Sequence, residues 1–110
     1  MQTTASGLQY EVIKMGDGPK PTLADPVTVH YRGELTNGTV FDSSYDRGAP
    51  ATFPLARLVK GWQEGIQLMP VGSTYRLVVP PDLGYGSAGA GDVIPPNATL
   101  VFQIELLGIS

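Results

Sequence analysis

The sequence predicts an α+β fold in which one short α-helix covers the apolar face of an antiparallel β-sheet. Several short segments alternate apolar and polar residues with a period of two, which is typical of strands. A single segment carries apolar residues at the helical spacing i, i+4, i+7. The 14 glycines and 10 prolines among the 110 residues punctuate these segments and favour turns between them.

Two strands are expected in the first third of the chain, over residues 8–13 and 27–32. Alternate apolar side chains would share one face of each strand; they are Leu8, Tyr10, Val12, Val27, Val29 and Tyr31. The other face of the second strand would carry polar side chains. We therefore expect His30 to be a solvated strand residue.

The second strand is expected to turn back at Asn37-Gly38 and to return over residues 39–43. Both residue types tolerate the positive φ that the central positions of a two-residue type I′ turn require. The following segment, residues 45–54, is rich in turn formers and is interpreted as a series of turns.

The only helical candidate covers about residues 60–68. Trp62, Ile66 and Met69 recur on one face of this helix, and Pro70 ends it. A helix this short is marginal alone, so it must pack on the sheet.

Two more strands are expected over residues 75–79 and 100–106, joined through a long glycine-rich loop over residues 83–96. The inner face of the last strand would consist of Leu100, Phe102, Ile104 and Leu106. In total, four to six antiparallel strands are expected, and the helix is the only available cover for their apolar face.

Composition limits the classes of function. A chain of 110 residues is expected to form one domain, residues 1–110. The absence of cysteine excludes a disulfide framework, a thiol nucleophile and a thiolate metal site. A net charge of -3 without a basic run argues against nucleic-acid binding.

The sequence also bears on location. The first six residues lack the charged and apolar regions of a signal peptide. No apolar run approaches the roughly 18 residues that a membrane helix needs. We expect the chain as given to be soluble, free of membranes and cytoplasmic, or periplasmic if the segment was excised from an exported parent protein.

Two motifs that suggest chemistry have simpler explanations. Residues 84–89 match G-x-G-x-x-G, but a dinucleotide site needs a strand directly before this motif and a helix directly after it. Pro80-Pro81 separates it from the preceding strand, and no helix is expected after it. The only histidine, His30, has no cysteine or second histidine with which to bind zinc.

Aromatic side chains on the inner faces of the helix and strands can converge on one apolar pocket, the usual form of a ligand site; they are Tyr31, Phe41, Trp62 and Phe102. Phe41 and Asp42 point to opposite faces of a regular strand, so both can line this pocket only if the strand ends or bulges there. Alternatively, Asp42 is a turn carboxylate, bonded to a serine or backbone group or paired with Arg47.

Ordered blocks over residues 7–107 complete the pattern, among them Phe41-Asp42-Ser43-Ser44, Gly61-Trp62-Gln63-Glu64-Gly65 and Ile94-Pro95-Pro96-Asn97-Ala98-Thr99-Leu100. Together they resemble the FKBP-type peptidyl-prolyl isomerases, the immunophilins that bind tacrolimus and rapamycin. The resemblance implies a strongly bent antiparallel sheet wrapped around one short helix. It also implies catalysis of Xaa-Pro bond rotation in proline-containing polypeptide clients, with no cofactor or metal.

The resemblance further implies a site. Trp62 would form the floor of the pocket, and Asp42 and Tyr85 its polar rim, with Arg47 holding Asp42. The backbone N–H of Val59 and the Tyr85 hydroxyl would donate to ligand carbonyls. The walls would be Tyr31, Phe41, Phe53, Leu58, Val59, Ile94 and Phe102.

Some positions depart from the best-known eukaryotic members. Ala51 stands where those often have Phe, Leu58 where they often have Val, and Ala90 where they often have His. The rim is therefore expected to be more open, which affects macrolide affinity more than catalysis. Gly7-Leu8-Gln9-Tyr10 looks closer to the catalytic domains of bacterial Mip/FkpA-like proteins, whose dimerising N-terminal region is missing here, so a monomer is expected.

Two other functions are considered beside the isomerase. A chaperone module could bind proline-containing segments with little turnover, against which the full set of implied site residues argues. An unrelated β-domain could bind carbohydrate on aromatic rings. That alternative predicts exposed aromatics, whereas the periodicity places them inward.

Overall fold

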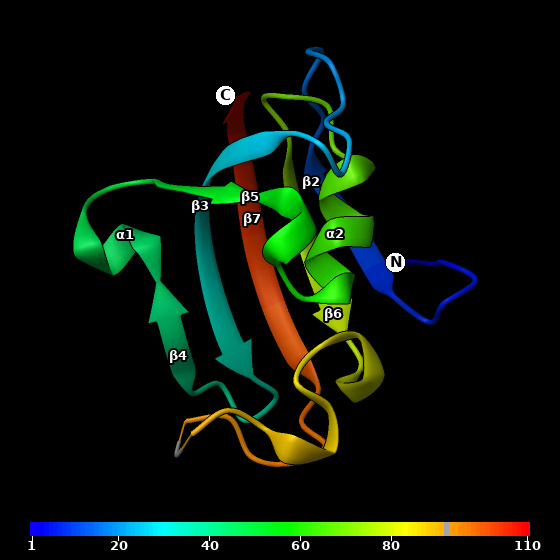
Figure 1. Ribbon diagram of the computed structural model, residues 1–110, viewed down its shortest axis with the longest axis vertical. Helices are drawn as coiled ribbons and strands as arrows, with labels where there is room; N and C mark the ends of the chain where they lie inside the picture. The colour runs from blue at the N-terminus through cyan, green and yellow to red at the C-terminus, as the bar shows by residue number, and fades with distance from the viewer. Residues whose placement is uncertain (92) are drawn as a thin grey trace.

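The computed structural model describes residues 1–91 and 93–110, which form one antiparallel sheet of seven strands with the helix α2 (Lys60–Gln67) across one face (Figure 1). Asp92, within the loop predicted over residues 83–96, lies outside the described residues. The sheet order is β1-β2-β6-β7-β3-β4, and β5 also pairs with β3. The strands are β1 (Gln2–Thr3), β2 (Gln9–Lys14), β3 (Pro26–Leu35), β4 (Val40–Ser43), β5 (Ala51–Pro54), β6 (Thr74–Val79) and β7 (Leu100–Ile109).

The core lies between α2 and the sheet, as the periodicity predicted. The expected inner faces of β3 and β7 are buried; they consist of Val27, Val29, Tyr31, Leu100, Phe102, Ile104 and Leu106. Trp62, Ile66 and Met69 are buried from the helix side. The α+β class and the single main helix are therefore confirmed.

Two glycines let α2 approach the sheet closely. A Cβ atom on Gly61 would lie 2.7 Å from Cγ1 of Val79, and one on Gly65 would lie 2.6 Å from Cδ1 of Leu77. Both contacts are shorter than carbon atoms allow, so the spacing i, i+4 of these glycines fixes the helix against β6. This close packing sets the depth at which Trp62 lies.

One edge of β3 is shared by two short strands. β4 pairs with its C-terminal half and β5 with its N-terminal half, and the short helix α1 (Ser44–Arg47) lies between them. Along β4, Asp42 pairs with Gly33 but Val40 pairs with Glu34, so Phe41 is an extra residue in the ladder. This register shift is the bulge that Phe41 and Asp42 required to share one pocket.

The predicted hairpin turn after β3 is wrong in type. The Gly38 N–H donates to the Leu35 carbonyl (3.0 Å) and the Leu35 N–H to the Thr39 carbonyl (2.9 Å), so the loop has three residues rather than two. Gly38 has φ 88° and Asn37 does not have a positive φ. A type I turn closed by a glycine in the left-handed region replaces the type I′ turn.

Other boundaries differ because of local pairing. Strand β5 and most of helix α1 lie in residues 45–54, which we had interpreted as turns, and β1 was not predicted at all. Val12 was expected to face the core but is 38% exposed. Its strand, β2, lies beyond β6 near the sheet edge, and its pairing with β6 shifts between Val12 and Lys14.

Candidate functional site

A pocket of about 310 Å³ opens between α2 and the sheet. Its lining comes from β3, β4, β5, β7, α2 and two loop segments; the residues are Tyr31, Asp42, Phe53, Arg57, Leu58, Val59, Trp62, Tyr85 and Phe102. All of these except Arg57 were site candidates from the sequence. The fold therefore brings together side chains that are up to 71 positions apart in the chain (102 minus 31).

The floor of the pocket is a cluster of aromatic rings around Trp62, which is 5% exposed. Its ring meets those of Tyr31 and Phe102 edge to face, with centroids 5.1 Å apart in both pairs. Phe53 meets it in the same manner at 6.2 Å. Edge-to-face contacts are favourable for aromatic quadrupoles, so the rings hold each other in a fixed apolar floor.

The floor contains one unsatisfied polar atom. The Trp62 indole Nε1 is buried and has no hydrogen-bond partner among the described residues. A buried donor without a partner costs free energy, so such groups are rare and mark places where water or a ligand supplies the acceptor.

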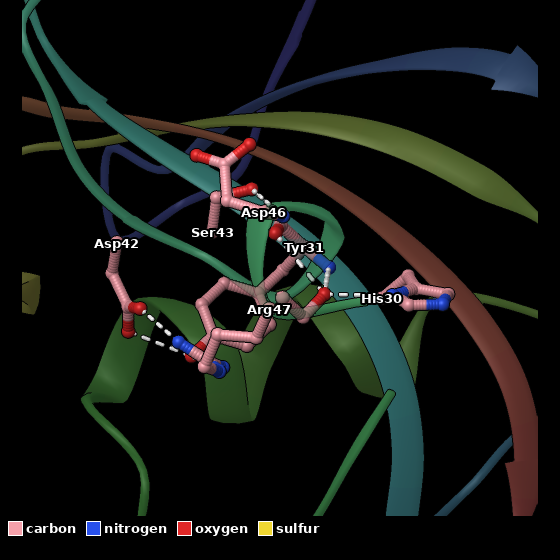
Figure 2. Close-up of polar contacts among 7 residues, drawn as sticks. His30, Tyr31, Asp42, Ser43, Asp46 and Arg47 are labelled. Carbon is pink, nitrogen blue, oxygen red and sulfur yellow. Dashed lines mark hydrogen bonds and ion pairs between the residues drawn. The ribbon is translucent and has the colours of Figure 1, made fainter. Parts of the chain in front are cut away.

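One side of the rim is a closed polar network (Figure 2). The Tyr31 hydroxyl donates to Oδ2 of Asp42 at 2.6 Å, and Arg47 Nη1 donates to Oδ1 of the same carboxylate at 2.5 Å. Arg47 Nη2 also donates to the Tyr31 hydroxyl at 2.9 Å. Each of the three side chains thus bonds to the other two, and both carboxylate oxygens are engaged.

This network changes the titration of its members. Partial burial acts to raise the pKa of Asp42, but hydrogen bonds from Tyr31 and Arg47 and the Arg47 charge outweigh it, so the pKa lies below its ordinary value. Burial, together with the hydrogen bond to Asp42, raises the pKa of Tyr31. At neutral pH the rim therefore carries a carboxylate, a neutral phenol and a guanidinium.

The helix α1 positions Arg47. Its N-cap is Ser43, whose Oγ accepts from the Asp46 N–H at 3.3 Å, and its C-cap is Gly48 with φ 73°. This single turn brings Arg47 back over the Asp42 carboxylate five residues earlier. Asp42 was expected either to line the pocket or to pair with Arg47, and in the structure it does both.

A buried serine ties α1 to β3. Ser44 Oγ accepts the Tyr31 N–H at 2.7 Å and lies 2.8 Å from Nδ1 of His30 (Figure 2 shows the His30 ring beside this turn). The His30 ring also stacks on Tyr45, with centroids 4.7 Å apart. The expectation that His30 is simply solvated is therefore wrong, because α1 covers the outer face of β3 at this point.

The opposite side of the rim is open. Tyr85 is 42% exposed, and its hydroxyl makes no hydrogen bond with the described residues. The Val59 N–H, at the N-cap position of α2, likewise has no acceptor in the described part of the chain. Two donors therefore face the pocket region without partners of their own.

Three predicted site residues do not line the pocket. Phe41 packs behind it, edge to face on Phe102 at 5.6 Å. Ile94 is buried and pairs with Ala90 in an isolated bridge. Arg47 acts through its contacts with Asp42 and Tyr31, one layer away from the lining.

A larger hollow of about 490 Å³ lies on the outer face of the sheet. Its lining mixes both signs of charge and contains one aromatic residue; it includes Glu11, Arg32, Glu34, Tyr45 and Arg76. Its lining is largely polar and charged, whereas ligand sites are mostly apolar. The smaller aromatic pocket is the better candidate despite its size.

Metal and membrane features are not apparent in the described residues. No group of three or more His, Asp or Glu side chains there could bind a metal ion. No helix in residues 1–91 and 93–110 is long and apolar enough to cross a membrane. The pocket offers an apolar floor, a fixed polar rim and three donors without partners among the described residues: the Trp62 indole N–H in the floor and the Val59 N–H and Tyr85 hydroxyl at the open side.

Comparison with known proteins gives a consistent result. The family model described as FKBP-type peptidyl-prolyl cis-trans isomerase matches residues 18–107. The chain is 60% identical to the FKBP-type peptidyl-prolyl cis-trans isomerase FkpA of Aeromonas hydrophila, over 99% of this chain and 40% of that protein. It is 54% identical to FK506-binding protein 1 of Dictyostelium discoideum, over 92% of this chain and 96% of that protein.

The architecture is shared as well. The crystal structure of FkpA from Escherichia coli superposes with a TM-score of 0.96 at 45% identity, and the match covers 99% of this chain and 51% of that one. The chain thus spans less than half the length of the first curated relative that it matches and nearly the whole of the Dictyostelium one.

Proposed function

The chain belongs to the family of FKBP-type peptidyl-prolyl cis-trans isomerases, and we propose that its aromatic pocket binds proline while the preceding peptide bond rotates. The observation that carries this proposal is the pocket itself: a floor of edge-to-face rings around Trp62, with unpaired donors at its mouth. A prolyl ring is apolar and compact, and its peptide carbonyls need donors. Both needs are met within about 310 Å³.

The physical task is to lower a rotational barrier. The peptide bond resists rotation by about 18–20 kcal/mol because of its partial double-bond character. The cis and trans states of Xaa-Pro are nearly balanced, so only the barrier needs to change. The enzyme must therefore bind the twisted amide more tightly than the planar one.

An apolar pocket favours the twisted form. The planar amide carries a charge separation that water stabilises, and this stabilisation is weaker when the bond is buried against Trp62 and Phe102. A thousandfold acceleration requires only ~4 kcal/mol of differential binding. Dry burial and two or three hydrogen bonds can supply this amount without a covalent step.

The rim residues take distinct roles in this proposal. The Val59 N–H and the Tyr85 hydroxyl donate to carbonyls of the substrate on either side of the proline. Asp42 is a carboxylate whose oxygens already accept from Tyr31 and Arg47. It therefore orients the Tyr31 ring and adds charge near the amide nitrogen, while Phe41 and Ile94 support the walls from behind.

The same pocket is proposed to bind tacrolimus and rapamycin, as is typical of the family. Ala51 and Ala90 offer less contact area than the larger residues common at these positions, so affinity should fall more than catalysis. Ala90 pairs with Ile94 in an isolated bridge, and Ala51 lies half-buried in β5.

The proposal extends to assembly and location. We expect residues 1–110 to act as one monomeric domain that serves proline-containing clients. A cytoplasmic location is expected for the chain as given, and a periplasmic one if it is part of an exported protein. Sedimentation of the purified domain and fractionation of cells expressing its parent chain measure these two properties.

A second candidate function is capture of proline-containing segments without turnover. The exposure of Tyr85 beside an apolar floor suits capture as well as catalysis. Capture predicts peptide binding without acceleration of exchange between the cis and trans forms.

The deciding experiment is NMR exchange spectroscopy on a short Xaa-Pro peptide, with and without rapamycin. Acceleration that rapamycin abolishes supports both the activity and the pocket. Acceleration that rapamycin leaves untouched supports the activity and indicates an altered rim near Ala51 and Ala90. Peptide binding without acceleration favours the capture function.

A further inference from the structure

Arg57 is a pocket residue that the sequence analysis missed, and it brings to the lining a charge that is unpaired among the described residues. Two charged residues line the pocket, Asp42 and Arg57. Asp42 is neutralised by Arg47 at 2.5 Å. Arg57 is exposed and forms no ion pair with the described residues.

The backbone that carries Arg57 is fixed on both sides. Gln63 Nε2, from α2, donates to the carbonyl of Ala56 at 3.1 Å and to that of Leu58 at 2.7 Å. Leu55 is fully buried, and its carbonyl accepts the Leu58 N–H at 3.2 Å. The Arg57 side chain therefore starts from a rigid position at the pocket mouth.

The surroundings of Arg57 are also positive. The helix α2 begins three residues later at Lys60, without a side-chain cap and without an acidic residue in its first turn. The N-terminal end of a helix carries partial positive charge. The mouth of the pocket is thus cationic on a chain whose net charge is -3.

We propose that Arg57 makes the pocket select Xaa-Pro segments with Asp or Glu immediately beside the proline. This inference rests on the proposed function, because it names the substrate class of the same pocket. The proline enters the aromatic floor, and an adjacent carboxylate comes within reach of the guanidinium, whose planar fork suits carboxylate recognition. A neutral neighbour leaves Arg57 solvated.

The expected preference for acidic substrates is modest, because the ion pair between Arg57 and the substrate carboxylate is exposed to solvent. Exposed ion pairs contribute little, which corresponds to a preference of about two- to fivefold in kcat/KM. The preference should fade at high salt, because the screening length shortens to about 3 Å at 1 M.

The test measures kcat/KM for two pairs of matched peptides. In the first pair the residue before proline is Glu or Gln, and in the second pair the residue after proline is Glu or Gln. The intact domain should prefer the acidic peptide in at least one pair. Arg57→Gln should bring that ratio to about one, and Arg57→Glu should invert it. Arg76→Gln, which removes the same charge from the outer sheet face, should keep the preference.

The outcomes separate this inference from the proposed function. Equal acceleration of acidic and neutral peptides by the intact domain overturns the selectivity and leaves the isomerase activity standing. No acceleration of any peptide overturns the isomerase activity itself. A preference that survives Arg57→Gln and Arg57→Glu also overturns the inference, because its source then lies elsewhere.

Discussion

The two sides of the pocket rim differ in how much of their hydrogen bonding is already satisfied. On the strand side, Tyr31, Asp42 and Arg47 bond to one another in a closed set. On the helix and loop side, the Val59 N–H and the Tyr85 hydroxyl have no partners among the described residues. One side is complete without a substrate, and in the proposed function the substrate completes the other.

Because of this difference, the two sides of the rim are expected to contribute to binding in different ways. A carboxylate accepts hydrogen bonds but cannot donate them, and both oxygens of Asp42 are occupied. The strand side therefore supplies shape and charge, while the helix and loop side supplies donors. Substitutions on the strand side should affect stability and activity together, whereas those on the open side should affect activity alone.

The largest effect is expected at the floor that both sides share. Trp62→Ala removes a buried ring that touches Tyr31, Phe53 and Phe102, and should cost about 3–5 kcal/mol in the free energy of unfolding and most of the activity. Urea unfolding measures the first quantity. Trp62→Phe, which keeps a ring and removes the unpaired indole N–H, should cost much less. Equal costs for both variants would contradict the ring packing as the cause.

The next effect is expected where the strand side is anchored. Ser44→Ala leaves the buried Tyr31 N–H without its acceptor and should cost about 1–3 kcal/mol of stability, with a parallel loss of activity. Ser87→Ala, at an exposed serine outside the pocket, is the control and should change stability by less than about 0.5 kcal/mol. If Ser44→Ala matched the control, the anchor would have no energetic role.

A smaller effect is expected on the open side. Tyr85→Phe removes one donor to the substrate and should lower kcat/KM by about two- to tenfold. The free energy of unfolding should stay unchanged, because the hydroxyl bonds to none of the described residues. A loss of stability in this variant would erase the distinction between the two sides.

The smallest effect concerns pH. The pKa of Asp42 is lower in the folded domain than in the unfolded chain, so its stabilising contribution is full above the ordinary value of about 3.9 and is lost as pH falls through the lower folded value. The difference in Tm between the intact domain and Asp42→Asn should therefore shrink below about pH 4. If this difference in Tm grew as the pH fell, the pKa of Asp42 would have to be raised, not lowered, in the folded domain. The effect is small because the carboxylate is half exposed and screened by solvent.

Sequence periodicity was sufficient for the sheet interior and the helix. The alternation in β3 and β7 and the spacing of Trp62, Ile66 and Met69 follow from burial on one face, which is a local property of the sequence. The short elements α1 and β5 could not be predicted in this way. They are fixed by pairing with β3 and by caps at Ser43 and Gly48, within a segment whose residues also suit turns.

The pattern predicted that aromatic rings converge on one pocket, whereas the polar rim and the remaining walls were predicted only through the family resemblance. Periodicity placed the aromatic rings inward, but the bulge at Phe41 and the closed network around Asp42 depend on tertiary contacts. Arg57 was missed because it lies in a short 3-10 helix, Leu55–Arg57, that the pattern did not predict, and nothing in the sequence distinguished it from an ordinary solvated arginine. Only the hydrogen bonds from Gln63 to the carbonyls of Ala56 and Leu58 show that the backbone around Arg57 is fixed, and these bonds form only in the folded chain.

The most direct test of the account is cis-trans exchange of an Xaa-Pro peptide by the double variant Asp42→Ala, Tyr85→Phe. The variant is expected to remain folded, as near-ultraviolet circular dichroism can verify, because the aromatic floor is intact. Losing both sides of the rim should lower kcat/KM by about tenfold or more. Full activity in a folded double variant would contradict the roles assigned to both sides of the pocket.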